Sequence, residues 1–76
     1  MNASTKRRVD DIINQLAQIS EALAELAIDA IQDAIHQGES KRPPLERGLT
    51  RARVAVDKAA RELRGGELVE MIDEGP

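Results

Sequence analysis

Apolar residues in the first half of the chain recur with the spacing of a helix. Between residues 9 and 35 the chain has no Gly, no Pro and no basic residue. The larger apolar residues there return every three or four positions, which is typical of a helix that packs on other helices. We predict one amphipathic helix over residues 4–36, with an apolar seam formed by Val9, Ile12, Leu16, Ile19, Leu23, Leu26, Ile28, Ile31 and Ile35.

The apolar surface of this predicted helix widens towards its end. At about 100° per residue, Ile28, Ile31 and Ile35 carry the apolar arc around one flank beyond Leu26. A single neighbouring helix could not cover so wide an arc. We therefore expect several helices to meet at this end.

A second helix is predicted after a polar connection at residues 36–44. Two prolines close this connection, and Pro suits the first turn of a helix because the donor it lacks would not be used there. We predict a helix over residues 44–64, ended by Gly65 and Gly66. Large and small residues alternate along its seam, and the small ones allow another helix to approach closely; the seam is Leu45, Leu49, Ala52, Val56, Ala59 and Leu63.

The last ten residues are acidic but contain regularly spaced apolar residues. Leu68, Met71 and Ile72 have the i, i+3, i+4 spacing of a helix. We predict a helical hairpin domain at residues 1–66, followed at 67–76 by an acidic tail or a short C-terminal helix. An acidic amphipathic segment of this kind could dock in the groove of a partner protein, or it could pack on its own bundle.

The fold class that follows is all-α, because a short connection between long helices makes them antiparallel neighbours. A hairpin of 76 residues is marginal alone, and without cysteine it has no disulfide to stabilise it. One hairpin also leaves a flank of the first helix uncovered. We therefore expect two copies to form a four-helix bundle, with a two-fold symmetric dimer as the usual solution.

Charge is divided between the two predicted helices. The first has acidic residues and no base between residues 9 and 35, whereas the second is mostly basic. Attraction between them could set the antiparallel register across the hairpin or the dimer. Four bases also share one outward face, here named the basic stripe, which could receive an acidic protein surface or phosphates; it consists of Arg47, Arg51, Lys58 and Arg61.

Composition limits what the basic stripe could bind. The chain has no aromatic residue, so it lacks the rings on which many RNA and single-strand binders stack bases. Its net charge is −3, which gives no general attraction to nucleic acid. Any binding of nucleic acid should therefore be weak, independent of sequence and sensitive to salt.

Acidic clusters provide the only candidates for metal chemistry. Glu25, Asp29, Asp33 and His36 share one arc of the first helix, but that arc points away from the apolar seam. Glu70 and Asp73 have a Glu-x-x-Asp spacing used for magnesium in all-helical nucleotide pyrophosphohydrolases, but no second motif accompanies it. No nucleophile triad, phosphate loop or nucleotide fingerprint is present. We expect no enzyme activity, no cofactor and no metal.

The sequence therefore favours a non-enzymatic protein–protein interaction or regulatory module built as a helical-hairpin homodimer. The alternative is a hairpin dimer that binds nucleic acid weakly through the basic stripe. A metal-dependent all-helical hydrolase is a more distant hypothesis. No segment approaches the ~20 apolar residues of a membrane span, and the N-terminus lacks signal-peptide features. We expect a cytoplasmic protein with no membrane partner.

Overall fold

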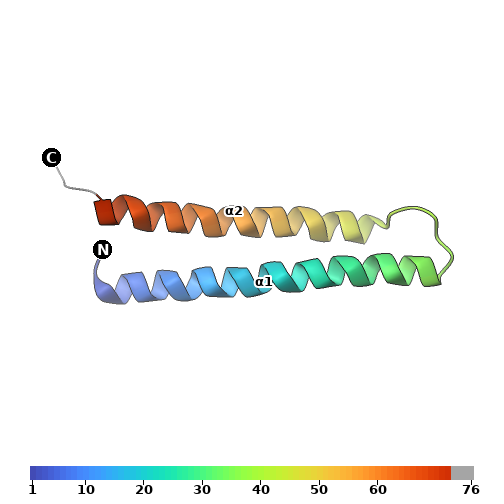
Figure 1. Ribbon diagram of the computed structural model, residues 1–76, viewed down its shortest axis with the longest axis horizontal. Helices are drawn as coiled ribbons and strands as arrows, with labels where there is room; N and C mark the ends of the chain where they lie inside the picture. The colour runs from blue at the N-terminus through green and yellow to red at the C-terminus, as the bar shows by residue number, and fades with distance from the viewer. Residues whose placement is uncertain (73–76) are drawn as a thin grey trace.

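Two long antiparallel helices make up the fold (Figure 1). The computed structural model describes the backbone of residues 1–72 and the side chains of residues 1–68. Helix α1 spans Ala3–His36 and helix α2 spans Pro44–Ile72, and they pack against each other along their length. The hairpin measures 62 × 21 × 11 Å. The predicted all-α hairpin is confirmed, and the described residues contain no strand.

Local interactions explain both ends of α1. Asn2 is the N-cap, and its side-chain oxygen accepts a hydrogen bond of 2.7 Å from the amide of Thr5. At the other end, Gly38 has φ of 80°, a conformation that costs a residue with a side chain about 1–2 kcal/mol. The amides of Gly38 and Glu39 donate to the carbonyls of Ile35 and Ala34, which forms a Schellman motif.

The predicted end of the second helix at residue 64 is wrong. Helix α2 continues through Gly65 and Gly66, and residues 67–72 extend it rather than forming a separate helix. A glycine inside a helix costs only about 1 kcal/mol relative to Ala. Beyond the glycines α2 still lies against α1, where the Glu67 side chain is only 13% exposed.

The interface between the helices is narrow. Three apolar residues are buried, Ile13, Ala34 and Ala60, and within the described residues no side chain is completely shielded from solvent. Two polar residues, Ser20 and Glu46, are also buried. The hairpin therefore has a line of contact between two helices rather than a core enclosed on all sides.

The structure divides the predicted apolar seam into two sets. The residues that lie half-buried between the helices are Val9, Leu16, Leu23, Leu49, Ala52, Val56 and Leu63. The residues that remain exposed are Ile12, Ile19, Leu26, Ile28, Ile31, Ile35, Leu45 and Ala59. The contact line on α1 runs instead through Ile13 and Ser20, one position further along than Ile12 and Ile19. One neighbouring helix covers only part of a wide apolar arc.

Among residues 1–72, no helix has an apolar stretch sufficient for a membrane span.

Candidate functional site

A polar contact joins the helices near the middle of the hairpin. The hydroxyl of Ser20 donates to Asp57 Oδ1 at 2.6 Å, and Arg53 Nε donates to Ser20 Oγ at 3.2 Å. A buried hydroxyl that has both a donor and an acceptor on the other helix fits only one alignment of the two helices. The sequence pattern missed this contact because Ser20 is not apolar.

A second polar cluster lies where α2 begins. The carboxylate of Glu46 is buried and accepts hydrogen bonds from both Arg42 and Thr50. The Arg42 Nη2 to Glu46 Oε1 distance is 2.6 Å, and the Thr50 hydroxyl lies 3.1 Å from the same oxygen. The hydrogen bonds from Arg42 lower the pKa of Glu46 against the opposing effect of burial. Glu46 is therefore held as a carboxylate that anchors the connecting loop to α2.

A third polar cluster lies at the open end of the hairpin. Lys6 Nζ is 2.8 Å from Asp10 Oδ2 and 4.0 Å from Glu67 Oε2. Interaction with the Asp10 carboxyl, followed by burial, raises the pKa of Glu67, while the hydrogen bond from Lys6 lowers the pKa of Asp10. Glu67 Oε2 is buried without a hydrogen-bond partner. Of the two carboxyl groups, Glu67 therefore keeps its proton to the higher pH.

An open groove of about 460 Å³ shows which flanks of the two helices face the same side. Ala17 and Glu21 of α1 line it together with Asp57, Arg61 and Arg64 of α2. We name this side of the hairpin the polar side.

The apolar face lies opposite the polar side. At about 100° per residue, Ile12, Ile19 and Leu26 lie on the flank of α1 away from Ala17. The same rotation on α2 places a second set on the flank away from Arg61. The groove pairs the other two flanks, so these flanks share the opposite side. The apolar face comprises Ile12, Ile19, Leu26, Leu45, Ala52 and Ala59.

The large residues of the apolar face are well exposed. Ile19 is 47% and Leu26 is 51% exposed, and Leu45 at the other helix is 65% exposed. A shallow pocket on the same side is lined by Val9, Leu63 and Gly66, among others. Contiguous exposed apolar residues on a small protein mark an interaction site more often than scattered ones do.

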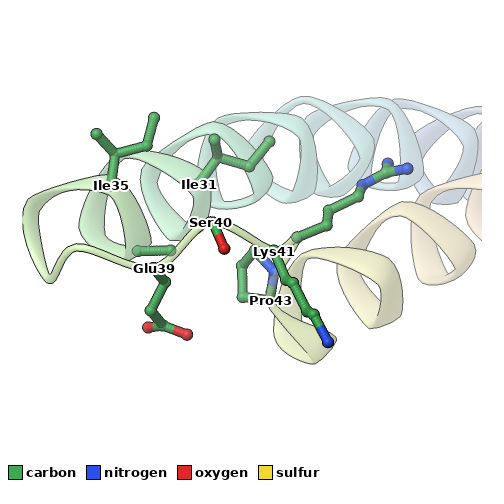
Figure 2. A pocket seen from close by; sticks show the side chains of 8 residues that line it. Ile31, Ile35, Glu39, Ser40, Lys41 and Pro43 are labelled. Atoms are coloured by element: carbon green, nitrogen blue, oxygen red, sulfur yellow. The ribbon is translucent and has the colours of Figure 1, made fainter.

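The loop end contains a separate pocket of about 320 Å³ (Figure 2). Ile31 and Ile35 line it together with loop residues that include Lys41 and Pro43. Figure 2 shows the two isoleucine side chains projecting from α1 away from the charged groups of Glu39 and Lys41. Several helices were expected to meet here, but in one hairpin Ile35 is 65% exposed.

The basic stripe lies on the exposed surface of α2. Arg47, Arg51, Lys58 and Arg61 are all exposed, and none of them forms an ion pair with any side chain of residues 1–68. Among these side chains, no acidic residue of α1 forms an ion pair with a basic residue of α2. The ion pair between Lys6 of α1 and Glu67 of α2 has the opposite sense. The expected charge pairing is therefore not satisfied inside a single hairpin.

Only some of the remaining predicted site residues have side chains that the structure describes. Glu25, Asp29, Asp33 and His36 are exposed on α1, and residues in the described part of the chain form no cluster suited to a metal ion. Leu68 is exposed. The other predicted positions lie outside the described side chains; they are Glu70, Met71, Ile72 and Asp73. Comparison with models of protein families, with curated proteins and with solved structures gives no match for this chain.

Proposed function

We propose that the protein is a non-enzymatic, cytoplasmic interaction module whose hairpin forms a homodimeric four-helix bundle. The observation that supports this proposal is the apolar face, which leaves Ile12, Ile19 and Leu26 in solvent on one side of a hairpin with few buried residues. A second hairpin would cover that face and supply the core that one copy lacks. The dimer would then display the basic stripe and the exposed Leu68 region as surfaces for a further protein partner.

The exposed surface area of the hairpin supports an assembly of this kind. The accessible surface is 6009 Å² for a chain of 8.3 kDa. A compact monomer of this mass exposes about 4,600 Å². The difference of about 1,400 Å² per chain exceeds the roughly 800 Å² that each partner buries in a standard interface. A single hairpin therefore has enough surplus surface for a stable interface.

Sedimentation equilibrium at micromolar concentration tests the dimer. We expect a species of twice the 8.3 kDa chain mass, with high helix content by circular dichroism at the same concentration. A well-folded monomer at that concentration would overturn the proposal.

The exposed basic stripe favours one alternative, binding of nucleic acid. The four cations have no ion-pair partner among the described side chains, so they are free to contact phosphates. Fluorescence anisotropy with mixed RNA and DNA at low and moderate salt tests this function. It predicts binding that falls with salt and that is lost in the double variant Arg51→Glu, Arg61→Glu. Absence of binding at low salt, or binding unchanged by these substitutions, would exclude it.

A further inference from the structure

We infer that the two copies pack with α1 of one chain on α2 of the other, through the apolar face. The two-fold axis of this arrangement is parallel to the helices, so the two hairpins point in the same direction. This inference rests on the proposed homodimer and specifies its interface. The occupant of the apolar face is a second copy of this chain.

The sizes of the side chains on the apolar face support this pairing. The flank from α1 carries large residues, Ile12, Ile19 and Leu26. The flank from α2 carries the small residues Ala52 and Ala59 opposite them, and its one large residue, Leu45, lies beyond them at the loop end. Stacking α1 on the partner's α2 therefore sets large residues against small ones at both contacts of the bundle. Knobs that enter holes in this way fill space without voids.

The heights of these residues along the hairpin also match. Ser20 contacts Asp57, so the neighbouring Ile19 lies level with residue 58, between Ala55 and Ala59. A two-fold axis parallel to the helices keeps each height unchanged. Ile19 of each chain would thus enter the gap between Ala55 and Ala59 of the other.

Leu26 and Ile12 also lie level with small residues of α2. By the same count along the helices, Leu26 lies level with Arg51, beside Ala52 and Gly48, and Ile12 lies level with Gly65, beside Gly66. Gly48 and Gly66 have nothing within 4 Å of the position of an added side chain, so the hairpin itself does not explain why these positions are glycine. A closely packed second copy does explain it.

Charge supports the same arrangement. Asp29 follows Ser20 by as many residues as Gly48 precedes Asp57, which places Asp29 level with Gly48, next to Arg47 and about one turn from Arg51. None of these three residues has an ion-pair partner among the described side chains of its own hairpin. Packing α1 on the partner's α2 brings acidic and basic helices together at the rim of the interface.

The competing arrangement packs α1 on α1 and α2 on α2, with the two hairpins pointing in opposite directions. It would set large residues on large ones at one contact and small on small at the other. It would also oppose two acidic helices and two basic helices, and juxtaposed like charges are unfavourable. Side-chain size and charge therefore both favour packing α1 of one chain on α2 of the other.

Disulfide trapping distinguishes the two arrangements, because the natural chain has no cysteine. The single variants Ile19→Cys and Ala59→Cys are mixed under mild oxidation, each with a tag of different mass. The inferred arrangement predicts the mixed disulfide as the main product, because the two positions meet across the interface within the few ångströms that a disulfide requires. The matched control replaces Ile19→Cys by Gln18→Cys, on the outer face of the same turn, and should give only traces.

The outcomes separate the inference from the proposed dimer. Efficient self-linking of Ile19→Cys alone would instead indicate α1 packed on α1, and would overturn the inference while leaving the dimer intact. Cross-linking no better than with Gln18→Cys in a protein that sediments as a dimer would likewise overturn it. A monomer by sedimentation would reject the proposed function itself.

A pair of charge substitutions provides a second readout without cysteine. Ala59 and Val54 are both exposed on α2 of a single hairpin, but only Ala59 lies in the inferred interface. Ala59→Glu should abolish the dimer at micromolar concentration, whereas Val54→Glu should leave it unchanged. Equal behaviour of the two variants contradicts the inferred face.

Discussion

The two sides of the hairpin use different chemistry. On the polar side, buried or half-buried groups are paired across or along the helices, as in the contact of Ser20 with Asp57 and the contact of Glu46 with Arg42. On the apolar face, by contrast, large aliphatic residues of α1 repeat every seven positions and are about half exposed. A repeating apolar surface binds strongly but specifies alignment weakly, whereas a few polar contacts specify alignment at small energetic gain. The polar side therefore sets the register, and the apolar face is left available for assembly.

The largest effect should come from a charged side chain placed between the two helices. Leu23 is half-buried between the helices and borders the apolar face. Leu23→Asp should destabilise the fold by about 3 kcal/mol or more, because it removes apolar contacts and brings an unpaired charge into a poorly solvated site. Circular dichroism should show loss of most helical signal. The control Gln18→Asp, on the outer face, should keep it; equal stability of both variants would contradict the assigned packing.

A smaller effect is expected when the polar contact in the middle is removed. Ser20→Ala eliminates the hydroxyl that connects Arg53 with Asp57. We expect a loss of about 1 kcal/mol in the free energy of unfolding, since one net hydrogen bond contributes about that much. Chemical denaturation measures the loss. The dimer mass should not change, because the substitution lies away from the apolar face; a monomeric Ser20→Ala variant would contradict the division of roles.

Substituting two glycines of α2 by alanine should change stability by a similar amount, but in the stabilising direction. Gly65 and Gly48 are both helical with open space around them, but only Gly48 borders the apolar face. Gly65→Ala should stabilise the protein by up to about 1 kcal/mol through helix propensity. Gly48→Ala should gain less, because a closely packed second copy would meet the added methyl group. Thermal unfolding compares them, and equal gains would indicate that nothing approaches Gly48.

The smallest effect concerns pH and the open end of the hairpin. The pKa of Glu67 is raised, so its protonated form stabilises the fold below the ordinary glutamate range, and this contribution is lost as pH rises through the raised value. The pKa of Glu46 is lowered, so its contribution is present above its ordinary value and is lost as pH falls. The protection factors of the amides in residues 5–10, which are corrected for the intrinsic pH dependence of exchange, should therefore rise when the pH is lowered to just above the ordinary glutamate range.

Glu67→Gln separates these two contributions. The amide remains neutral at every pH and, like a protonated carboxyl, has a hydrogen that it can donate to the neighbouring Asp10. The variant should show slow exchange at the open end at neutral pH, and it should lose the pH dependence there. Asp10 and Glu67 are also influenced by Lys6 and Arg64, which remain charged throughout this range. An unchanged pH profile would show that Glu67 is not the group responsible.

The apolar spacing in the sequence predicted the helices, whereas the contacts between the helices were predicted only in part. The three- and four-residue spacing of apolar positions correctly predicted two long helices, and the prolines correctly placed the start of the second. Spacing could not show which part of a wide apolar arc α2 would cover, so the exposed Ile19 and buried Ser20 were not distinguished. The glycine signal at Gly65 and Gly66 predicted an end that α2 does not have, because two glycines lower helix propensity by only about 1 kcal/mol each and the helix continues to Ile72. The contacts of Ser20 with Asp57 and Arg53 were missed because they join residues far apart in sequence. The contacts of Glu46 with Arg42 and Thr50 have local i, i+4 spacing, but spacing alone does not show that Glu46 is buried.

A final consequence arises from the way the hairpin returns on itself. Ala3 and Ile72 lie at one end of the molecule, and the connecting loop lies at the other, along a body 62 Å in length (Figure 1). In the inferred dimer the first turns of both α1 helices and the last turns of both α2 helices would lie at the same end of the bundle. The competing arrangement would separate the two α1 starts by roughly the whole length of the bundle. Energy transfer between fluorophores attached near residue 3 would thus be efficient in the inferred dimer and weak in the competing one.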